Sequence, residues 1–237
     1  MPQVRSTLML LSALALTACQ PQTPGPQQQP AEPEPQAQTA PPAAPAPLEH
    51  SLTALPGHET DAPVLTTKQV IVMHTDAGDL TIEVYPEAAP NAVARFVELA
   101  QTGFYDDTPV SRVVPGFVAQ FGINWRDAYK SWQANLFKDD PTYFALERGT
   151  LAFAKAGPDT NSTQVFINYT ENNRLADPQY NFTVFGKVVD GMDVVDHFAQ
   201  VGDPSGGLDQ GQLWENGEAY LQGLDVKPTM IQTVRVQ

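Results

Sequence analysis

Histidine and cysteine side chains are frequent metal ligands, but their positions in this chain do not suggest a metal site. The four histidines, His50, His58, His74 and His197, and the single Cys19 form no ligand-like spacing. No Walker-type or Gly-x-Gly-x-x-Gly loop follows a strand-like segment. We therefore expect an activity that uses neither a metal ion nor a nucleotide cofactor.

The remaining candidates for chemistry are an arginine, two glutamines and several aromatic residues, gathered in three strings. The first string is Arg112 followed by Val113–Gln120, with Pro-Gly-Phe at its centre. The second is Gly149–Asn168 and the third is Val184–Met192. All three combine short apolar runs with glycine-containing turns.

These three strings, in this order, resemble the motifs of the cyclophilin-type peptidyl-prolyl isomerases. The resemblance covers about residues 68–199, with weaker support to residue 237. It implies a mainly β fold, a closed eight-stranded antiparallel barrel capped by two α-helices. It also implies an enzyme that catalyses cis–trans isomerisation of X–Pro bonds without a cofactor.

The chemistry of this reaction can be derived from the amide bond. Rotation about an X–Pro bond is slow because the nitrogen shares its lone pair, which gives a barrier of about 18–20 kcal/mol. A catalyst needs a donor aimed at the prolyl nitrogen, where the lone pair localises as the bond twists, and an apolar pocket for the ring. Arg112 suits the donor role because a guanidinium is always charged and has a fixed geometry. Phe117 and Phe166 would form the pocket floor.

The resemblance thus implies a complete set of site residues. The catalytic residues are Arg112, Phe117 and Gln120, and the substrate-binding residues are Ala154, Lys155, Gln164, Phe166, Leu175 and Phe182. Gln120 and Gln164 would hold the peptide backbone and orient Arg112. Ala154 and Lys155 would line the groove through main-chain groups.

The sequence also departs from the family pattern at several of these positions. Ser111 replaces the histidine that commonly precedes the catalytic arginine, and Lys155 replaces the groove asparagine. Arg174 stands where the pocket rim has tryptophan, and Phe182 where it has histidine. These changes leave the donor and the pocket floor in place and bear more on specificity than on activity. The alternative is a non-catalytic barrel that binds proline-containing segments as a chaperone or scaffold.

Periodicity predicts the elements that position the site. A run rich in β-branched residues at 70–75, a turn signal at 76–79 and alternating apolar and polar residues at 80–85 predict a hairpin. Pro90 opens a helix to about residue 101. Further strands are expected at 110–114, 117–121, 150–154, 164–168, 182–189 and 230–236, and a second helix at 191–199. Segment 124–148 is expected to be a loop with one or two packed helical turns, or else a flap that contacts substrate.

Composition divides the 237-residue chain into three parts. Twelve of its 22 prolines fall in residues 20–63, which hold five acidic residues and no Lys or Arg. Such a segment cannot bury enough apolar surface to fold, so residues 19–63 are expected to form a disordered tether, or a ligand for a Pro-binding partner. Residues 64–237 would form the isomerase domain. The net charge of −14 disfavours nucleic acid as a partner, and we expect a monomer.

The first eighteen residues have the pattern of a signal peptide. A basic start precedes the apolar run Leu8–Leu16, which is too short to span a bilayer. Leu16-Thr17-Ala18-Cys19 resembles a bacterial lipobox, which implies lipidation of Cys19; an ordinary cleavable signal is the alternative. Gln20 favours sorting to the outer membrane over the inner. The expected protein is therefore an extracytoplasmic, membrane-anchored lipoprotein that assists folding of exported proteins.

Overall fold

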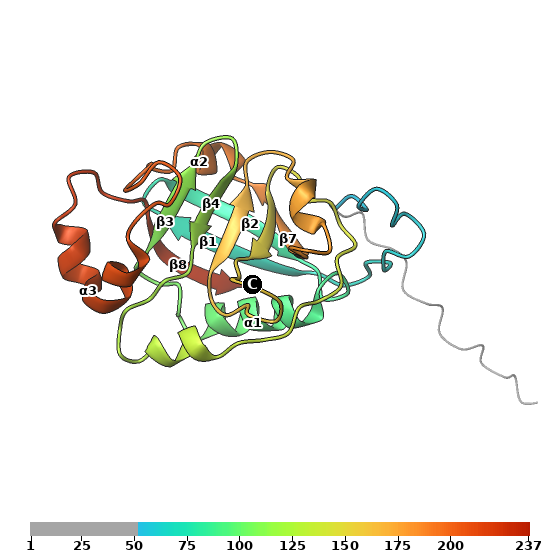
Figure 1. Ribbon diagram of the computed structural model, residues 1–237, viewed down its shortest axis with the longest axis horizontal. Coiled ribbons are helices and arrows are strands. Elements are labelled where there is room, and N and C mark those ends of the chain that lie inside the picture. Colours follow the sequence, from blue (N-terminus) through green and yellow to red (C-terminus); the bar gives the residue numbers. More distant parts are fainter. Residues whose placement is uncertain (1–51) are drawn as a thin grey trace, which may run out of the picture. The chain divides into compact units, whose positions relative to one another are not determined.

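The computed structural model describes residues 52–237, and its centre is a closed antiparallel barrel (Figure 1). Around the barrel the strands follow the order β1-β2-β7-β5-β6-β4-β3-β8, and β8 pairs with β1 to close it. The strands are β1 (Gln69–Thr75), β2 (Gly78–Val84), β3 (Thr108–Val114), β4 (Val118–Phe121), β5 (Thr150–Phe153), β6 (Val165–Asn168), β7 (Val184–Asp190) and β8 (Met230–Val236). The predicted eight-stranded barrel is confirmed.

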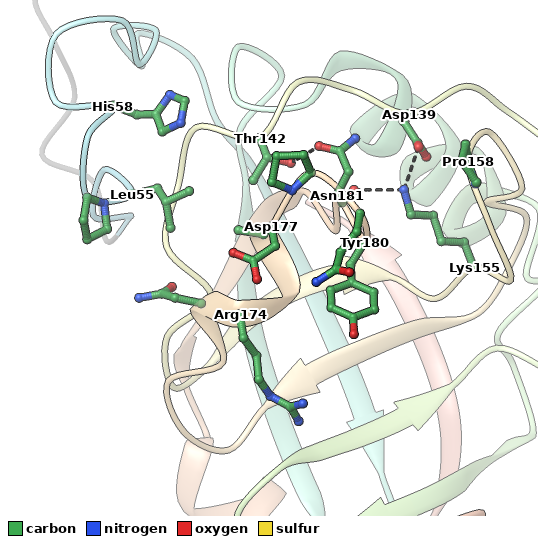
Figure 2. A pocket seen from close by; sticks show the side chains of 15 residues that line it. Leu55, His58, Asp139, Thr142, Lys155, Pro158, Arg174, Asp177, Tyr180 and Asn181 are labelled. Carbon is green, nitrogen blue, oxygen red and sulfur yellow. Dashed lines mark hydrogen bonds and ion pairs between the residues drawn. The ribbon is translucent and has the colours of Figure 1, made fainter.

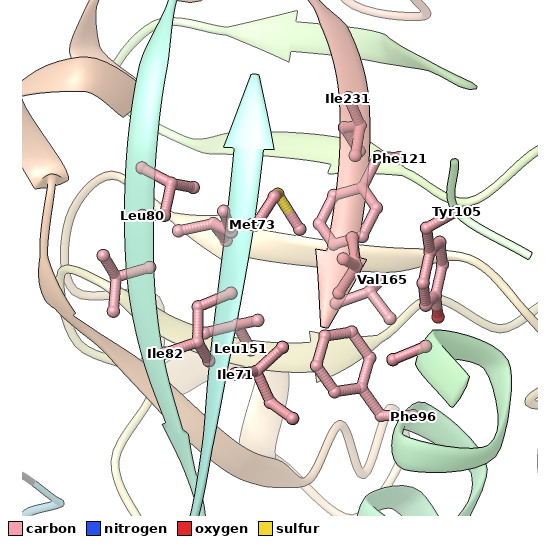
Figure 3. Close-up of a cluster of buried hydrophobic side chains, with 14 of the residues drawn as sticks. Ile71, Met73, Leu80, Ile82, Phe96, Tyr105, Phe121, Leu151, Val165 and Ile231 are labelled. Carbon is pink, nitrogen blue, oxygen red and sulfur yellow. The ribbon is translucent and has the colours of Figure 1, made fainter. Parts of the chain in front are cut away.

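The barrel interior is filled by alternate residues of its strands (Figure 3). In the β1–β2 hairpin, Ile71 pairs with Ile82 and Met73 with Leu80, and all four side chains are fully buried. Because successive strand residues point to opposite faces, the residues between them lie on the outside. This period of two is visible in the sequence of β2, where Thr81 and Glu83 are the outward residues.

Helix α1 (Pro90–Gln101) packs against β7 and β8. Phe96 is fully buried against Phe185, with 5.2 Å between the ring centroids. Asp140 caps the helix from outside: its carboxylate accepts hydrogen bonds from the N–H groups of Asn91 and Ala92 at 3.1 and 2.9 Å. These donors have no partner within a helix, so Asp140 fixes segment 124–148 to the start of α1.

Segment 124–148 is a loop with a short 3-10 helix at Lys130–Ala134. Three of its aromatic side chains, Tyr129, Trp132 and Phe137, are partly buried against the barrel core. The predicted loop with a packed helical turn is confirmed.

Two helices follow β7. Helix α2 (Met192–Asp196) is shorter than the predicted span of 191–199. Helix α3 (Gln210–Gln222) was not predicted. Its sequence gives a weak signal because Gly211 and Gly217 interrupt it and Leu213 is its only buried apolar residue. At the kink, Gly217 contacts Trp125 so closely that an added Cβ would lie 1.9 Å from the indole ring.

The N-terminal boundary of the folded part lies earlier than predicted. Residues 52–63 were expected to belong to the tether, but Ala54 forms a β-bridge with Phe144. The N–H of Leu55 donates to Tyr143 at 2.8 Å, and Leu52 is 4% exposed in an apolar cluster on the outer face of the barrel. Because residues 20–63 have a low apolar content as a whole, composition did not reveal that Leu52 and Leu55 pack against the barrel.

The predicted signal peptide, the lipidation site Cys19 and the tether up to residue 51 lie outside the described residues. Across residues 52–237, no helix combines the length and apolar character needed to cross a bilayer.

Candidate functional site

Three neighbouring strands bring the central site residues together on the outer face of the barrel. Arg112 on β3 pairs with Gln120 on β4, and Gln120 pairs with Phe166 on β6. Their neighbours Ala119 and Phe121 point into the barrel core. Strand alternation therefore directs Gln120 and Phe166 outwards, where they form one surface with Arg112.

Eight of the nine residues predicted to form the site line one pocket of about 210 Å³, here called the Phe117 pocket. They are Arg112, Phe117, Gln120, Ala154, Lys155, Phe166, Leu175 and Phe182, and Val118 completes the lining. Phe166 and Phe182 meet edge to face, with ring centroids 5.5 Å apart. The pocket thus has apolar aromatic walls and two cationic side chains at its edge.

Arg112 is held over this pocket by neutral groups. Its Nε donates to the Ser205 carbonyl at 2.6 Å, and its Nη1 donates to Gln120 Oε1 at 3.3 Å. The guanidinium carbon lies 5.6 Å from the centre of the Phe117 ring. Burial lowers the pKa of Arg112, yet a guanidinium remains charged in proteins.

Gln164, the ninth predicted residue, supports the pocket without lining it. Gln120 Nε2 donates to Gln164 Oε1 at 2.8 Å, and Gln164 Nε2 donates to Gln210 Oε1 at 3.1 Å. A chain of side-chain hydrogen bonds therefore runs from Arg112 to the first residue of α3.

Ser205 and Gln210 were missed by the sequence analysis. Ser205 lies in a turn in which Asp203 Oδ1 accepts hydrogen bonds from the N–H groups of Ser205 and Gly206. Gly207 packs so closely on Arg112 that an added Cβ would lie 2.6 Å from the Arg112 Cβ. The string Asp-Pro-Ser-Gly-Gly at 203–207 signals a turn, but nothing in it locates that turn beside Arg112.

Lys155 contributes to the site through its side chain as well as its position. Its Nζ donates to Asp139 Oδ2 at 2.6 Å and to the Asn181 carbonyl at 2.9 Å, and its side chain is 3% exposed. The ammonium lies 5.6 Å from the centre of the Phe182 ring. These two contacts, here called the Lys155 clamp, join segment 124–148 to the loop that carries Phe182. The sequence analysis predicted only a main-chain role for Lys155 and did not predict this clamp.

Arg174 does not line the Phe117 pocket but lies beside it, next to Leu175. Its guanidinium carbon lies 5.4 Å from the centre of the Phe117 ring. Phe117 is therefore in contact with two guanidinium groups, those of Arg112 and Arg174.

A larger pocket of about 760 Å³ shares Lys155 with the Phe117 pocket (Figure 2). Its lining comes from four segments: Leu55–His58, Asp139–Thr142, Lys155–Pro158 and Asn173–Asn181. Figure 2 shows the Lys155 ammonium between Asp139 and Asn181 at one end of it. Sequence analysis missed this pocket because it assigned residues 55–58 to the tether.

The geometry can now be compared with known proteins. The family model described as cyclophilin type peptidyl-prolyl cis-trans isomerase/CLD matches residues 70–212, more than half of the chain. This chain belongs to that family. The matched region contains every residue that lines the Phe117 pocket and the whole hydrogen-bond chain from Arg112 to Gln210.

Individual relatives agree with this assignment. A peptidyl-prolyl cis-trans isomerase of Acinetobacter baylyi is 35% identical over 147 residues, which are 60% of this chain and 77% of the relative. The peptidyl-prolyl cis-trans isomerase-like 3 of Mus musculus is 32% identical and covers 55% of this chain and 82% of its own length. A 40% identical stretch of the isomerase-like 2 protein of Gibberella zeae spans only 22% of that protein.

A solved structure supports the cyclophilin fold. The cyclophilin-type isomerase of Cryptosporidium parvum superimposes with a TM-score of 0.54 over 72% of this chain and 98% of its own, at 22% identity.

Proposed function

We propose that this cyclophilin-type isomerase acts on X–Pro bonds of exported polypeptides, and that Arg112 provides the catalytic donor. The observation that carries the proposal is the placement of Arg112 beside Gln120 at the edge of an aromatic pocket that includes Phe117 and Phe166. A structure of the Cryptosporidium cyclophilin in the presence of the dipeptide Ala-Pro supports a proline-containing ligand.

The geometry supports catalysis by stabilisation of the twisted amide. The apolar walls formed by Phe117, Phe166 and Leu175 exclude water from a bound proline ring. As the bond twists, the lone pair localises on the prolyl nitrogen and becomes a better hydrogen-bond acceptor than in the planar ground state. A guanidinium already fixed by Ser205 and Gln120 gains more from this nitrogen in the transition state, which lowers the barrier.

The extracytoplasmic location rests on the sequence of the first nineteen residues. A signal-like start followed by Leu-Thr-Ala-Cys supports lipidation at Cys19, and the Pro-rich stretch that follows would act as a spacer. Labelling bacterial cells that express the full chain with a palmitate analogue tests this: we expect label in the wild type and none in Cys19→Ala. Equal labelling of both would contradict lipidation at this residue.

Catalysis is tested by measuring cis–trans exchange of a short Ala-Pro peptide with the full chain, using magnetisation-exchange NMR. The uncatalysed reaction takes tens to hundreds of seconds, so acceleration is easily separated from the background. We expect catalytic amounts of protein to accelerate exchange. Peptide binding without acceleration would instead indicate the scaffold alternative and contradict the proposal.

A further inference from the structure

The arginines of the described region divide into two groups. Four of the six form ion pairs with carboxylates: Arg95 with Glu98, Arg126 with Asp107, Arg148 with Asp196 and Arg235 with Asp106. Within residues 52–237, Arg112 and Arg174 form no ion pair. These two are also the arginines in contact with Phe117.

Three carboxylates of the neighbouring loops are engaged elsewhere or directed away. Asp203 accepts three hydrogen bonds from Ser205 and Gly206, and Asp139 is bound to Lys155. Asp177 lies in the turn after Arg174, but Figure 2 shows the Arg174 side chain extending away from it. Within residues 52–237, neither guanidinium at Phe117 is thus paired with a carboxylate, and together they give this edge of the Phe117 pocket a local positive charge, on a chain whose net charge is −14.

The two guanidinium groups also differ in how they can meet a ligand. Arg112 is half-buried and already fixed by two neutral acceptors, whereas Arg174 is exposed and held by its contact with the Phe117 ring. Both guanidinium carbons lie within 5.6 Å of the Phe117 ring centre, so a residue next to a proline ring bound there would be within reach of them. Guanidinium groups form charge-assisted, bidentate hydrogen bonds with carboxylates.

We propose that Arg174 is a specificity-determining residue, which together with Arg112 makes the site prefer proline segments that carry an Asp or Glu next to the proline. This inference rests on the proposed isomerase function and names the substrate class of the same site. The aromatic walls of the Phe117 pocket bind the proline ring, and the guanidinium groups of Arg112 and Arg174 favour an acidic residue next to it.

The test uses the full chain and four short peptides that differ only beside the proline: Glu-Pro, Gln-Pro, Pro-Glu and Pro-Gln. Exchange rates and binding affinities are both measured by NMR. In at least one register, we expect the Glu peptide to exceed its Gln counterpart in kcat/KM and affinity by about two- to fivefold at low salt. The preference should shrink near 1 M salt, where the Debye length is about 3 Å.

A matched pair of variants locates the effect. Arg174→Gln should reduce the Glu/Gln ratio to near one. Arg148→Gln removes the same charge from an exposed arginine that lines neither pocket, and should leave the ratio unchanged. A ratio near one in the wild type, or a ratio unaffected by Arg174→Gln, would overturn the inference.

The design separates this inference from the proposed function. If no peptide is turned over, the isomerase proposal fails, and the affinity ratio still decides whether the site prefers acidic neighbours. If all four peptides are turned over equally, the isomerase proposal stands and the acidic preference is wrong.

Discussion

Two cationic side chains line the Phe117 pocket, and their surroundings differ. Lys155 is almost fully buried, and its ammonium donates to the Asp139 carboxylate and to the Asn181 carbonyl. Arg112 is half-buried and donates to the neutral oxygens of Ser205 and Gln120. One cation is neutralised within the protein, whereas the other keeps its charge available to a ligand.

This difference assigns a structural role to the charge of Lys155 and a catalytic role to the charge of Arg112. A buried ion pair holds two segments in register, and losing one partner leaves an uncompensated charge that destabilises the fold. A fixed cation without a counter-ion stabilises negative or electron-rich groups that develop in a transition state. We therefore expect variants around Lys155 to change stability first, and variants around Arg112 to change turnover first.

The largest effect is expected from Asp139→Asn, which leaves Lys155 without its anionic partner. Removing one partner of a buried pair costs about 3–5 kcal/mol. Because Asp139 keeps 13% of its side-chain surface exposed, we expect the unfolding free energy to fall by about 3 kcal/mol, at the lower end of this range. Urea denaturation measures this loss. The control is Asp127→Asn, whose partner Lys130 is half exposed and whose loss should cost under about 0.5 kcal/mol. Similar small losses in both variants would show that the clamp does not hold the pocket.

The same clamp predicts a dependence of stability on pH. Burial raises the pKa of Asp139, but the hydrogen bond from Lys155 and other hydrogen bonds outweigh it, so the folded-state pKa lies below its usual value. A lowered folded-state pKa means stability that is present above the unfolded pKa of about 3.9 and lost as the pH falls through the folded value. Unfolding free energies of wild type and Asp139→Asn should therefore converge below about pH 4. A constant difference down to pH 2 would contradict the assignment.

The next effect concerns the segment that precedes the barrel. Leu52 shares an apolar cluster with Phe166 and Leu65 on the outer face of the barrel, so Leu52→Ala should lower the unfolding free energy by about 2–3 kcal/mol. The matched control is Val64→Ala at a side chain that is 62% exposed, where a change below about 0.5 kcal/mol is expected. A chain that begins at Val64 should lose at least as much unfolding free energy as the Leu52→Ala variant does. An unchanged melting temperature in this shorter chain would show that residues 52–63 contact the barrel without stabilising it.

The smallest effect is expected at the far end of the Arg112 hydrogen-bond chain. Gln210 is exposed, so Gln210→Leu should lower kcat by about two- to threefold through lost orientation of Gln164, with KM nearly unchanged. Gln210→Glu keeps the acceptor for Gln164 and should restore kcat. Loss of kcat in both variants, or in neither, would show that α3 does not position the site.

The sequence predicted those features that depend on local pattern or motif. Leu80 and Ile82 alternate with Thr81 and Glu83, and Ile71 and Met73 lie in a run rich in β-branched residues, so both strands could be deduced. Most residues that line the Phe117 pocket lie in the first two motif strings, and Leu175 and Phe182 lie between the second and the third. The resemblance therefore predicted that they come together in one place.

The missed features depend on contacts between segments distant in sequence. Helix α3 has two glycines and one buried leucine, so periodicity did not reveal it. The Ser205 carbonyl lies 93 residues along the chain from Arg112, and a backbone acceptor has no side-chain signature. Leu52 lies in a Pro-rich stretch, and the average composition of that stretch gave no sign that any of its residues packs against the barrel.

The central claim is that the charge of Arg112 stabilises the transition state of isomerisation, and one comparison tests it most directly. Peptide exchange and peptide affinity are measured for wild type and Arg112→Ala by NMR. The account predicts at least a tenfold loss of turnover, about 1.4 kcal/mol of transition-state stabilisation, with an unchanged melting temperature and peptide affinity within about threefold. Wild-type turnover in a folded Arg112→Ala variant would contradict the account.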